Sequence, residues 1–414
     1  MPWKVSGVVE ERARFAVEYE SGEWTMADLC RHYGIARRTG YRIVARWQQE
    51  GAAGLKDRSR APLAHPNQTP LEVEAAVLEL RRAHMSWGPR KLRRWLEDRH
   101  PEQAWPAPST IGGLLTRAGL AHARRLRRRT PPFTQPFAAA GEPNAVWCAD
   151  FKGWFRTRDG ERIDPLTMTD AASRYLLRCQ AVEKTDTAAV RSISEAAFRE
   201  YGLPRAIRTD NGPPFASRGI GGLSRLSLYW MRLGIVPERI QPGHPEQNGR
   251  HERMHRTLAQ ETARPAQANR RRQQEAFDRF RTEYNQERPH EALGQRPPAA
   301  VYAASPRAYP ARLPEPEYNS GVEVRCVYPH GQFFWKGHDV FLGKVLAGER
   351  IGLEPIDDRY WCVCFGDFPI AWFDSRELMT GNLPPAGTAG DGNPEISNSR
   401  DSRIPTAAAT AAGV

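Results

Sequence analysis

Three acidic residues in separate segments could together carry out metal-dependent chemistry on a phosphodiester. Asp150 follows a short apolar run rich in aromatic residues, and Asp210 closes a second apolar run at 206–209. Glu252 lies where helix-favouring residues resume after Gly249. Two carboxylates at the ends of buried strands and one on a helix can converge at one end of a sheet. Carboxylates suit Mg²⁺, and two such ions about 3.5–4 Å apart can serve the attacking and leaving oxygens of an in-line displacement.

The residues around these acids have the patterns of the strands and helices that would position them. Short apolar runs predict strands, and apolar residues at helical spacing predict helices, so three strands followed by alternating helices and strands predict an α/β sheet. Asp159, Asp164 and Asp170 lie in turns or at strand ends, and we interpret them as structural. The expected order is strand 145–157, strand 162–169, strand 175–182, helix 186–201, strand 205–210, a short helix at 223–233, a strand at 237–241 and a helix through Glu252.

Three motifs surround the acids in a fixed order. They are Trp-x-x-Asp at 147–150, Thr-Asp-Asn-Gly at 209–212 and His-Pro-x-x-Asn-Gly-x-x-Glu-Arg at 244–253. These motifs resemble the core of retroviral integrases and bacterial insertion-sequence transposases of the DDE superfamily. The resemblance implies an RNase H-like core in which Asp150, Asp210 and Glu252 are catalytic and hold two Mg²⁺ ions, for which Mn²⁺ can substitute.

The spacing leaves two candidates for the third acid. The family's usual interval of 35 residues after Asp210 leads to Glu246, whereas 41 residues separate Asp210 from Glu252. Glu246 follows His-Pro in a turn before Gly249, and the family places its acid three residues beyond that glycine. We therefore favour Glu252 and attribute the surplus to a loop insertion around 217–224.

The charge of the chain favours a polyanionic partner. The sequence holds 60 Lys and Arg against 48 Asp and Glu, a net charge of +12, and neutralising DNA phosphates with such residues releases condensed counterions. Residues 25–44 show where DNA would be read, because a capping signature at Thr25 opens one helix and Gly34 makes a turn into a second, basic helix. The candidate contacts to DNA are Arg37, Arg38, Thr39 and Arg42, together with Arg256, which matches a basic position near DNA in the resembling family.

The remaining segments complete a multidomain α+β organisation. Residues 322–378 alternate in short runs broken by glycines, which predicts a small all-β barrel. Trp-Gly-x-Arg-Lys-Leu at 87–92 resembles a second helix-turn-helix of insertion-sequence transposases. The expected parts are a helix-turn-helix domain (1–56), a linker (57–70), a second helix-turn-helix domain (71–122), a basic Pro-rich linker (123–142), an RNase H-like α/β integrase core (143–305), a small C-terminal β-barrel (318–379) and a disordered tail (380–414).

We expect a DNA transposase that binds the terminal inverted repeats of a mobile element and performs Mg²⁺-dependent 3′-end cleavage and strand transfer. Its partners would be double-stranded DNA and further copies of the chain, because two element ends must be joined together. No apolar run approaches the ~20 residues of a membrane span, so we expect no membrane partner and a cytoplasmic protein that associates with the nucleoid when bound to DNA. Two alternatives stay open. One is a domesticated, catalytically inactive DNA-binding relative, and the other is a nuclease acting on RNA·DNA hybrids, which helix-turn-helix units suited to B-form grooves disfavour.

Overall fold

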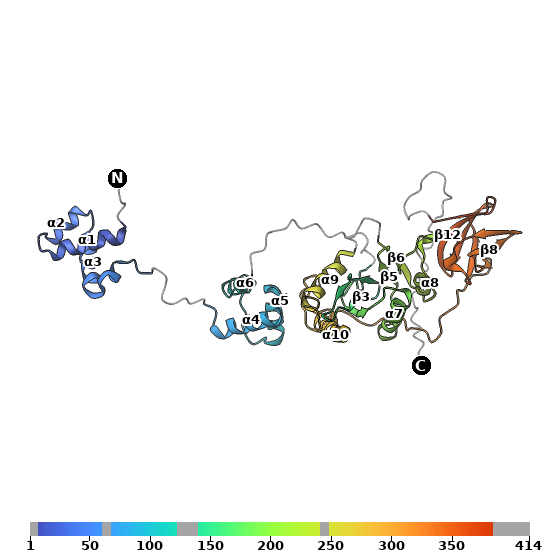
Figure 1. The fold of residues 1–414 in the computed structure, drawn as a ribbon, viewed down its shortest axis with the longest axis horizontal. Coiled ribbons are helices and arrows are strands. Elements are labelled where there is room, and N and C mark those ends of the chain that lie inside the picture. Colours follow the sequence, from blue (N-terminus) through green and yellow to red (C-terminus); the bar gives the residue numbers. More distant parts are fainter. Residues whose placement is uncertain (1–6, 60–67, 122–139, 241–247, 384–414) are drawn as a thin grey trace, which may run out of the picture. The chain divides into compact units, whose positions relative to one another are not determined.

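The computed structural model describes residues 7–59, 68–121, 140–240 and 248–383 (Figure 1). The chain divides into two compact units, Met1–Pro70 and Leu71–Val414. Three sequence predictions lie wholly or mostly outside the described residues: the basic Pro-rich linker at 123–142, the alternative acid Glu246 and the tail at 380–414. Among the described residues, no helix combines the length and the apolar character needed to cross a bilayer.

The first unit is a small helical domain. Its elements are α1 (Val8–Glu20), α2 (Met26–His32), α3 (Arg37–Glu50) and the 3₁₀ helix η1 (Gly51–Leu55). The Thr25 hydroxyl accepts the backbone N–H of Asp28, which confirms the predicted cap at the start of α2. Phe15, Leu29 and Val44, one from each α-helix, pack together in its core.

A second set of three helices opens the larger unit. These are α4 (Leu71–Ala83), α5 (Pro89–Arg99) and α6 (Pro108–Arg117). Trp87, from the Trp-Gly segment before α5, is fully buried among Val77, Leu92 and Ile111 and stacks on His84 with ring centroids 3.9 Å apart. The Trp-Gly motif is therefore part of this core.

The central sheet contains the predicted strands, three in succession and then two that alternate with helices along the chain. Its first three long strands, β1 (Val146–Phe151), β3 (Arg162–Asp170) and β4 (Leu176–Val182), are antiparallel, with β3 in the middle. Parallel strands β5 (Ala206–Thr209) and β6 (Val236–Arg239) then extend the sheet from β1.

The prediction of one strand over 145–157 is wrong, because the chain bends after Phe151. Gly153 has φ +91°, a conformation that L side chains rarely adopt, and Trp154 beside it is exposed. Pairing with β3 resumes only in the short β2 (Phe155–Arg156).

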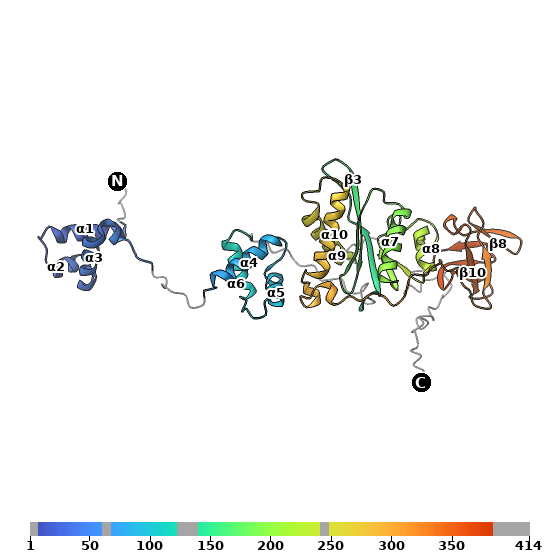
Figure 2. The same ribbon diagram turned by 90° about the horizontal axis from the view of Figure 1, so that it is seen from below.

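Helices cover both faces of the sheet (Figure 2). On one face, α7 (Thr187–Tyr201) and α8 (Arg225–Arg232) pack in a large apolar cluster that includes Trp147, Phe198 and Trp230. On the other face lie α9 (Gly249–Thr262) and α10 (Arg270–Gln286). The buried side-chain amide of Asn285 bonds both the N–H and the C=O of Leu176, at 2.8 and 2.9 Å, and so ties α10 to β4.

Polar contacts connect α4–α6 to this second face. The buried guanidinium of Arg288 donates to Glu261 at 2.8 Å and to Ser86 at 3.1 Å, and His84 Nδ1 lies 3.0 Å from a carboxylate oxygen of Glu283. Burial at this surface also lowers the pKa of Lys91 to about 7. Arg288 follows α10, so the segment after this helix contributes to packing against α4–α6.

The C-terminal region is all β, as expected, but its described strands do not close into a barrel. They form an open antiparallel sheet of five strands and a separate hairpin. Closure is unnecessary because the inner face of the sheet is covered by the hairpin's Phe333 and Trp335 and by Leu228 and Met231 of α8. In sheet order the strands are β13 (Met379–Gly381), β12 (Phe368–Asp374), β11 (Tyr360–Phe365), β10 (Arg350–Pro355) and β7 (Glu323–Cys326), and the hairpin pairs β8 (Gln332–Trp335) with β9 (His338–Phe341).

Candidate functional site

The register of two neighbouring strands brings Asp150 and Asp210 to the same edge of the sheet. Parallel strands β1 and β5 pair Cys148 with Arg208. Asp150 lies two residues after Cys148, and Asp210 lies two residues after Arg208. Because side chains alternate along a strand, the two acids lie on the same face of the sheet and at the same height along the strands. Both acids are half-buried, and the N–H of Gly212, in the turn after β5, donates to Asp210 at 3.2 Å.

Helix α9 carries Glu252 over this same face. The helix turns His251, Met254, His255 and Leu258 inward, at the spacing of three and four residues that marks one side of a helix. Glu252 lies on the exposed part of α9, in its first turn. The expectation that an acid three residues beyond Gly249 stands on a helix is confirmed.

The electrostatics of Asp150 connect the three acids. The pKa of Asp150 is raised to about 7. Burial is the largest cause, and the negative charges of Asp210 and Glu252 also contribute to the rise. Both carboxylates are therefore close enough to oppose ionisation of the third. A cluster of this kind is relieved by a cation, which neutralises the mutual repulsion.

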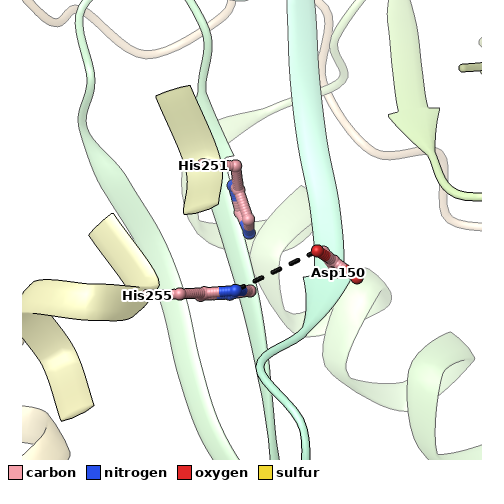
Figure 3. A group of neighbouring side chains, drawn as sticks. All are labelled: Asp150, His251 and His255. Carbon is pink, nitrogen blue, oxygen red and sulfur yellow. Dashed lines mark ion pairs between the residues drawn. The ribbon is translucent and has the colours of Figure 1, made fainter. Parts of the chain in front are cut away.

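Two histidines from α9 lie beside Asp150 (Figure 3), and both rings contact threonine hydroxyls of β3. His251 Nε2 and His255 Nε2 lie 2.7 and 2.6 Å from the Thr167 hydroxyl, and the Thr169 hydroxyl lies 2.8 Å from His251 Nδ1. His255 Nδ1 faces Asp150 Oδ2 at 4.0 Å. Burial lowers the pKa of His255 to about 3 and that of His251 well below its usual range, so both rings are neutral.

Asn248, the residue before α9, also reaches Asp150. Its side-chain amide donates to Asp150 Oδ2 at 3.3 Å, while its own Oδ1 is buried without a partner among the described residues. Asp150, His251 and His255 offer ligand atoms that all lie within 4.8 Å of one another. Carboxylate, amide oxygen and imidazole together form a donor set that a divalent cation would fit.

The other acids of the first strands have structural surroundings. Asp170 is fully buried, accepts the N–H of Asn144 at 2.7 Å and accepts both the N–H and the hydroxyl of Ser173. Asp159 accepts the Thr157 hydroxyl within its turn. Asp164 is buried on β3, and burial raises its pKa. These contacts agree with the structural interpretation of Asp159 and Asp170.

The predicted DNA-contacting residues lie at the surface. Arg37 and Arg38, the first residues of α3, are exposed, as is Arg42 one turn later, while Thr39 is partly buried. Arg256 is exposed on α9, one turn after Glu252. The contact of these five residues with DNA stays a prediction.

Sequence reasoning assigned no role to His251 or His255, and it placed Asn248 in the third motif without a role of its own. The spacing of His251 and His255 could have revealed them, because residues four apart share one face of a helix. Thr167 and Thr169, two apart on β3, similarly share one face of their strand. That these two faces meet is a property of the tertiary structure.

Models of known families match most of the described chain. Two models described as an integrase core domain match residues 140–245 and 233–298. A helix-turn-helix model matches residues 11–62, and a homeodomain-like model matches residues 39–115.

Two insertion-element proteins are similar over much of their length. The 39.2 kDa protein of insertion element IS476, from Xanthomonas euvesicatoria, is 32% identical over 285 residues, which are 66% of this chain and 76% of that protein. The 31.7 kDa protein of insertion element IS407, from Burkholderia multivorans, is 28% identical over 254 residues, which are 59% of this chain and 85% of that protein.

Two similar solved structures are of retroviral proteins, and both similarities are low. The HTLV-2 integrase catalytic core domain in complex with magnesium is 16% identical, with a TM-score of 0.31, and covers 39% of this chain and 97% of its own. A chain of the simian T-cell lymphotropic virus intasome is 15% identical, with a TM-score of 0.36, and covers 70% of this chain and 97% of its own. The assignment of the chain therefore depends on the family models and the insertion-element relatives.

Proposed function

Since the chain belongs to the bacterial insertion-sequence transposases of the DDE superfamily, with their retroviral-integrase-like core, we propose that it cuts and joins DNA at the ends of a mobile element. The observation that carries the proposal is the geometry of the acids: Asp150 and Asp210 follow paired positions of β1 and β5, and α9 carries Glu252 near enough for its charge to act on Asp150. The pKa of the half-buried Asp150, which burial and the charges of Asp210 and Glu252 raise to about 7, supports it, because a bound cation would stabilise the ionised carboxylate.

In this proposal Asp150, Asp210 and Glu252 hold two Mg²⁺ ions, for which Mn²⁺ can substitute. When bound, the ions would supply Lewis acidity to the attacking and the leaving oxygen of a phosphodiester. The charges of Asp210 and Glu252 both act on Asp150, and Asn248 donates a hydrogen bond to Asp150 Oδ2. The exposure of Glu252 suits an acid that must reach both an ion and a DNA strand.

The proposed reaction is a pair of displacements at phosphorus. Water first breaks a phosphodiester at each element end and leaves a 3′-hydroxyl. That hydroxyl then attacks a phosphodiester of target DNA, so one ester is exchanged for another and no ATP is needed. Within the site, the chain's own residues position the acids and exclude bulk water from Asp150.

The helix-turn-helix domain would select the element ends. In such domains the second helix lies in the major groove with its first residues against base edges. Arg37, Arg38, Thr39 and Arg42 occupy this part of α3, and three of the four side chains are free of the domain's core. Because two ends must be joined, we propose that the protein acts on DNA as an oligomer.

A cleavage and joining assay tests the proposal. The substrates are oligonucleotide duplexes copied from the DNA that flanks the reading frame, with a plasmid as target and Mg²⁺ in the buffer. Asp150→Asn, Asp210→Asn and Glu252→Gln should each lose 3′-end nicking and strand transfer while still shifting the duplex in a gel. Asp159→Asn, in an exposed turn, is the matched control and should retain both activities.

Two outcomes would overturn parts of this proposal. If Glu252→Gln stayed active while Glu246→Gln lost activity, the third acid is Glu246. If wild-type protein bound the duplex without Mg²⁺ and neither nicked nor joined it under any metal, the chain is a non-catalytic DNA-binding relative.

A further inference from the structure

The imidazole of His255 extends from α9 toward the carboxylate of Asp150 on β1. Its Nδ1 lies 4.0 Å from Asp150 Oδ2, and both groups point toward each other (Figure 3). This distance is too long for a hydrogen bond. Two atoms that could each bind a metal ion therefore face each other without a hydrogen bond between them.

The hydrogen bonds of the neighbouring threonines decide which nitrogen of each histidine has a free lone pair. The Thr167 hydroxyl donates to the carbonyl oxygen of Asp150 at 3.2 Å, and a carbonyl can only accept. The Thr167 hydroxyl has only one hydrogen, so in its two other contacts its oxygen must accept. The donors are Nε2–H of His251, at 2.7 Å, and Nε2–H of His255, at 2.6 Å. Both rings are then the Nε2–H tautomer, as assigned from this network.

The two rings differ at their other nitrogen. His251 Nδ1 accepts the Thr169 hydroxyl at 2.8 Å, so both nitrogens of His251 are engaged. His255 Nδ1 has no hydrogen-bond partner among the described residues, and its lone pair faces Asp150. Asp150 Oδ2 accepts one hydrogen bond, from Asn248, and a carboxylate oxygen has a second lone pair available.

We propose that His255 is a nitrogen ligand, through Nδ1, of the metal ion that Asp150 holds. The inference rests on the proposed function, because it concerns an ion of that site. One ion can reach both atoms, because their separation of 4.0 Å is below the sum of two metal–ligand bonds of about 2.1 Å each. The hydrogen bond from Nε2 to Thr167 fixes the ring and its tautomer, as partners of metal-binding histidines commonly do.

If His255 is a ligand, the site should prefer transition metals more strongly than a site with oxygen ligands alone. Mg²⁺ favours an all-oxygen shell, whereas imidazole raises affinity for the transition metals in the order Mn²⁺ below Co²⁺ below Ni²⁺. His255→Asn should therefore weaken Mn²⁺ and Co²⁺ binding by about tenfold or more while changing Mg²⁺ binding much less. Titration calorimetry on the full chain gives these affinities without any assay of catalysis.

Pulsed electron paramagnetic resonance of Mn²⁺ bound to the full chain reads the ligand directly. Wild-type protein should show the ¹⁴N coupling of a coordinated imidazole, and His255→Gln should lose it. Since the chain has 11 histidines, His251→Gln is the matched control. It removes the adjacent ring, whose nitrogens are both engaged, and should retain the coupling. Asp150→Asn should lose the bound Mn²⁺ itself.

The outcomes separate this inference from the proposed function. If wild-type protein bound no Mn²⁺ at the Asp150 site, the proposed function would fail. If Mn²⁺ bound but the ¹⁴N coupling were absent, or were unchanged in His255→Gln, the ligand assignment alone would be wrong. Wild-type protein labelled with ¹⁵N-histidine provides a readout that does not depend on the folding of any variant. If a histidine ring coordinates Mn²⁺, the ¹⁴N coupling in the spectrum should be replaced by a ¹⁵N coupling. An unchanged spectrum would exclude histidine.

Discussion

Burial and neighbouring negative charges both oppose ionisation of the Asp150 carboxyl. Its ordinary pKa of 3.8 rises to about 7, first because it is buried and then because Asp210 and Glu252 are near. The folded chain thus favours the neutral form, whereas the unfolded chain ionises at much lower pH. Stability from this group is fully present below pH 4 and is lost as the pH rises toward 7.

Replacing this carboxyl should therefore stabilise the protein without metal. Asp150→Asn should raise the melting temperature at pH 8 in EDTA, by a free energy of at most about 4 kcal/mol, since each pKa unit corresponds to about 1.4 kcal/mol. The gain should shrink toward pH 4. Adding Mg²⁺ at pH 8 should stabilise the wild type and not the variant. Thermal unfolding followed by circular dichroism measures both effects, with exposed Asp339→Asn as a control. A gain that did not depend on pH would contradict the assignment.

At the scale of elements, the helices of the first unit pack so closely at Gly40 that no side chain fits there. Gly40 lies in the first turns of α3 and is buried against α1 and α2. A Cβ at this position would lie 2.5 Å from Cys30 Sγ and 2.9 Å from a ring carbon of Phe15. Glycine is unfavourable within a helix by roughly 1 kcal/mol relative to alanine, so its presence here reflects packing rather than helix propensity.

Two glycine-to-alanine changes should therefore affect the free energy of unfolding differently. Gly40→Ala should destabilise the first unit by roughly 1–3 kcal/mol, the usual cost of overpacking a core, and weaken DNA binding by displacing α3. Gly113→Ala in α6 should be neutral or stabilising by up to about 1 kcal/mol, because its Cβ would meet only the end of the Arg117 side chain, at 3.5 Å. Amide hydrogen exchange of each helix set in the full chain measures both changes. Equal protection of α1–α3 in Gly40→Ala and wild type would show that the packing tolerates the methyl group.

At the scale of the molecule, the C-terminal sheet and the integrase-like core share one apolar cluster. Leu228 and Met231 of α8 and Leu223 before it pack with Phe333 and Val363 of the C-terminal strands. The segment at 217–224, which the sequence treats as a surplus loop, contributes to this contact. The N–H of Gly221 there donates to Asn382 at 2.6 Å, and Arg232 pairs with Glu349. The segment at 217–224, which the sequence analysis interprets as an insertion, thus contacts the C-terminal sheet.

Removing the C-terminal strands should consequently damage the core. A chain truncated after Pro314 would expose the apolar side of α8. Each such side chain contributes about 1.5–3 kcal/mol when buried, so the truncated chain should be less stable by several kcal/mol and should self-associate. Leu228→Glu with Met231→Lys should restore a monomer in the truncated chain and should destabilise the full-length one. Light scattering and chemical denaturation check this. A truncated chain that was monomeric and as stable as the full length would show that the two regions are independent.

Local patterns in the sequence were enough to predict most elements and the acids. Thr25 and the apolar spacing around it predicted α2 and α3 because capping and helical periodicity are short-range properties. The strand that carries Asp150, the strand before Asp210 and the helix of Glu252 were predicted for the same reason. The break at Gly153 was missed because a single positive φ leaves the apolar pattern on either side unchanged.

The sequence by itself determined the family, the order of the strands and helices, and the acidic residues to examine. Only the tertiary structure decided that the C-terminal sheet stays open, because α8, distant in the chain, covers the face that a barrel would have to close on itself. It alone decided that His251 and His255 of α9 meet Thr167 and Thr169 of β3. The physical reason is that both outcomes depend on which apolar faces pack together, and such pairings between distant segments leave no trace in the local pattern of either one.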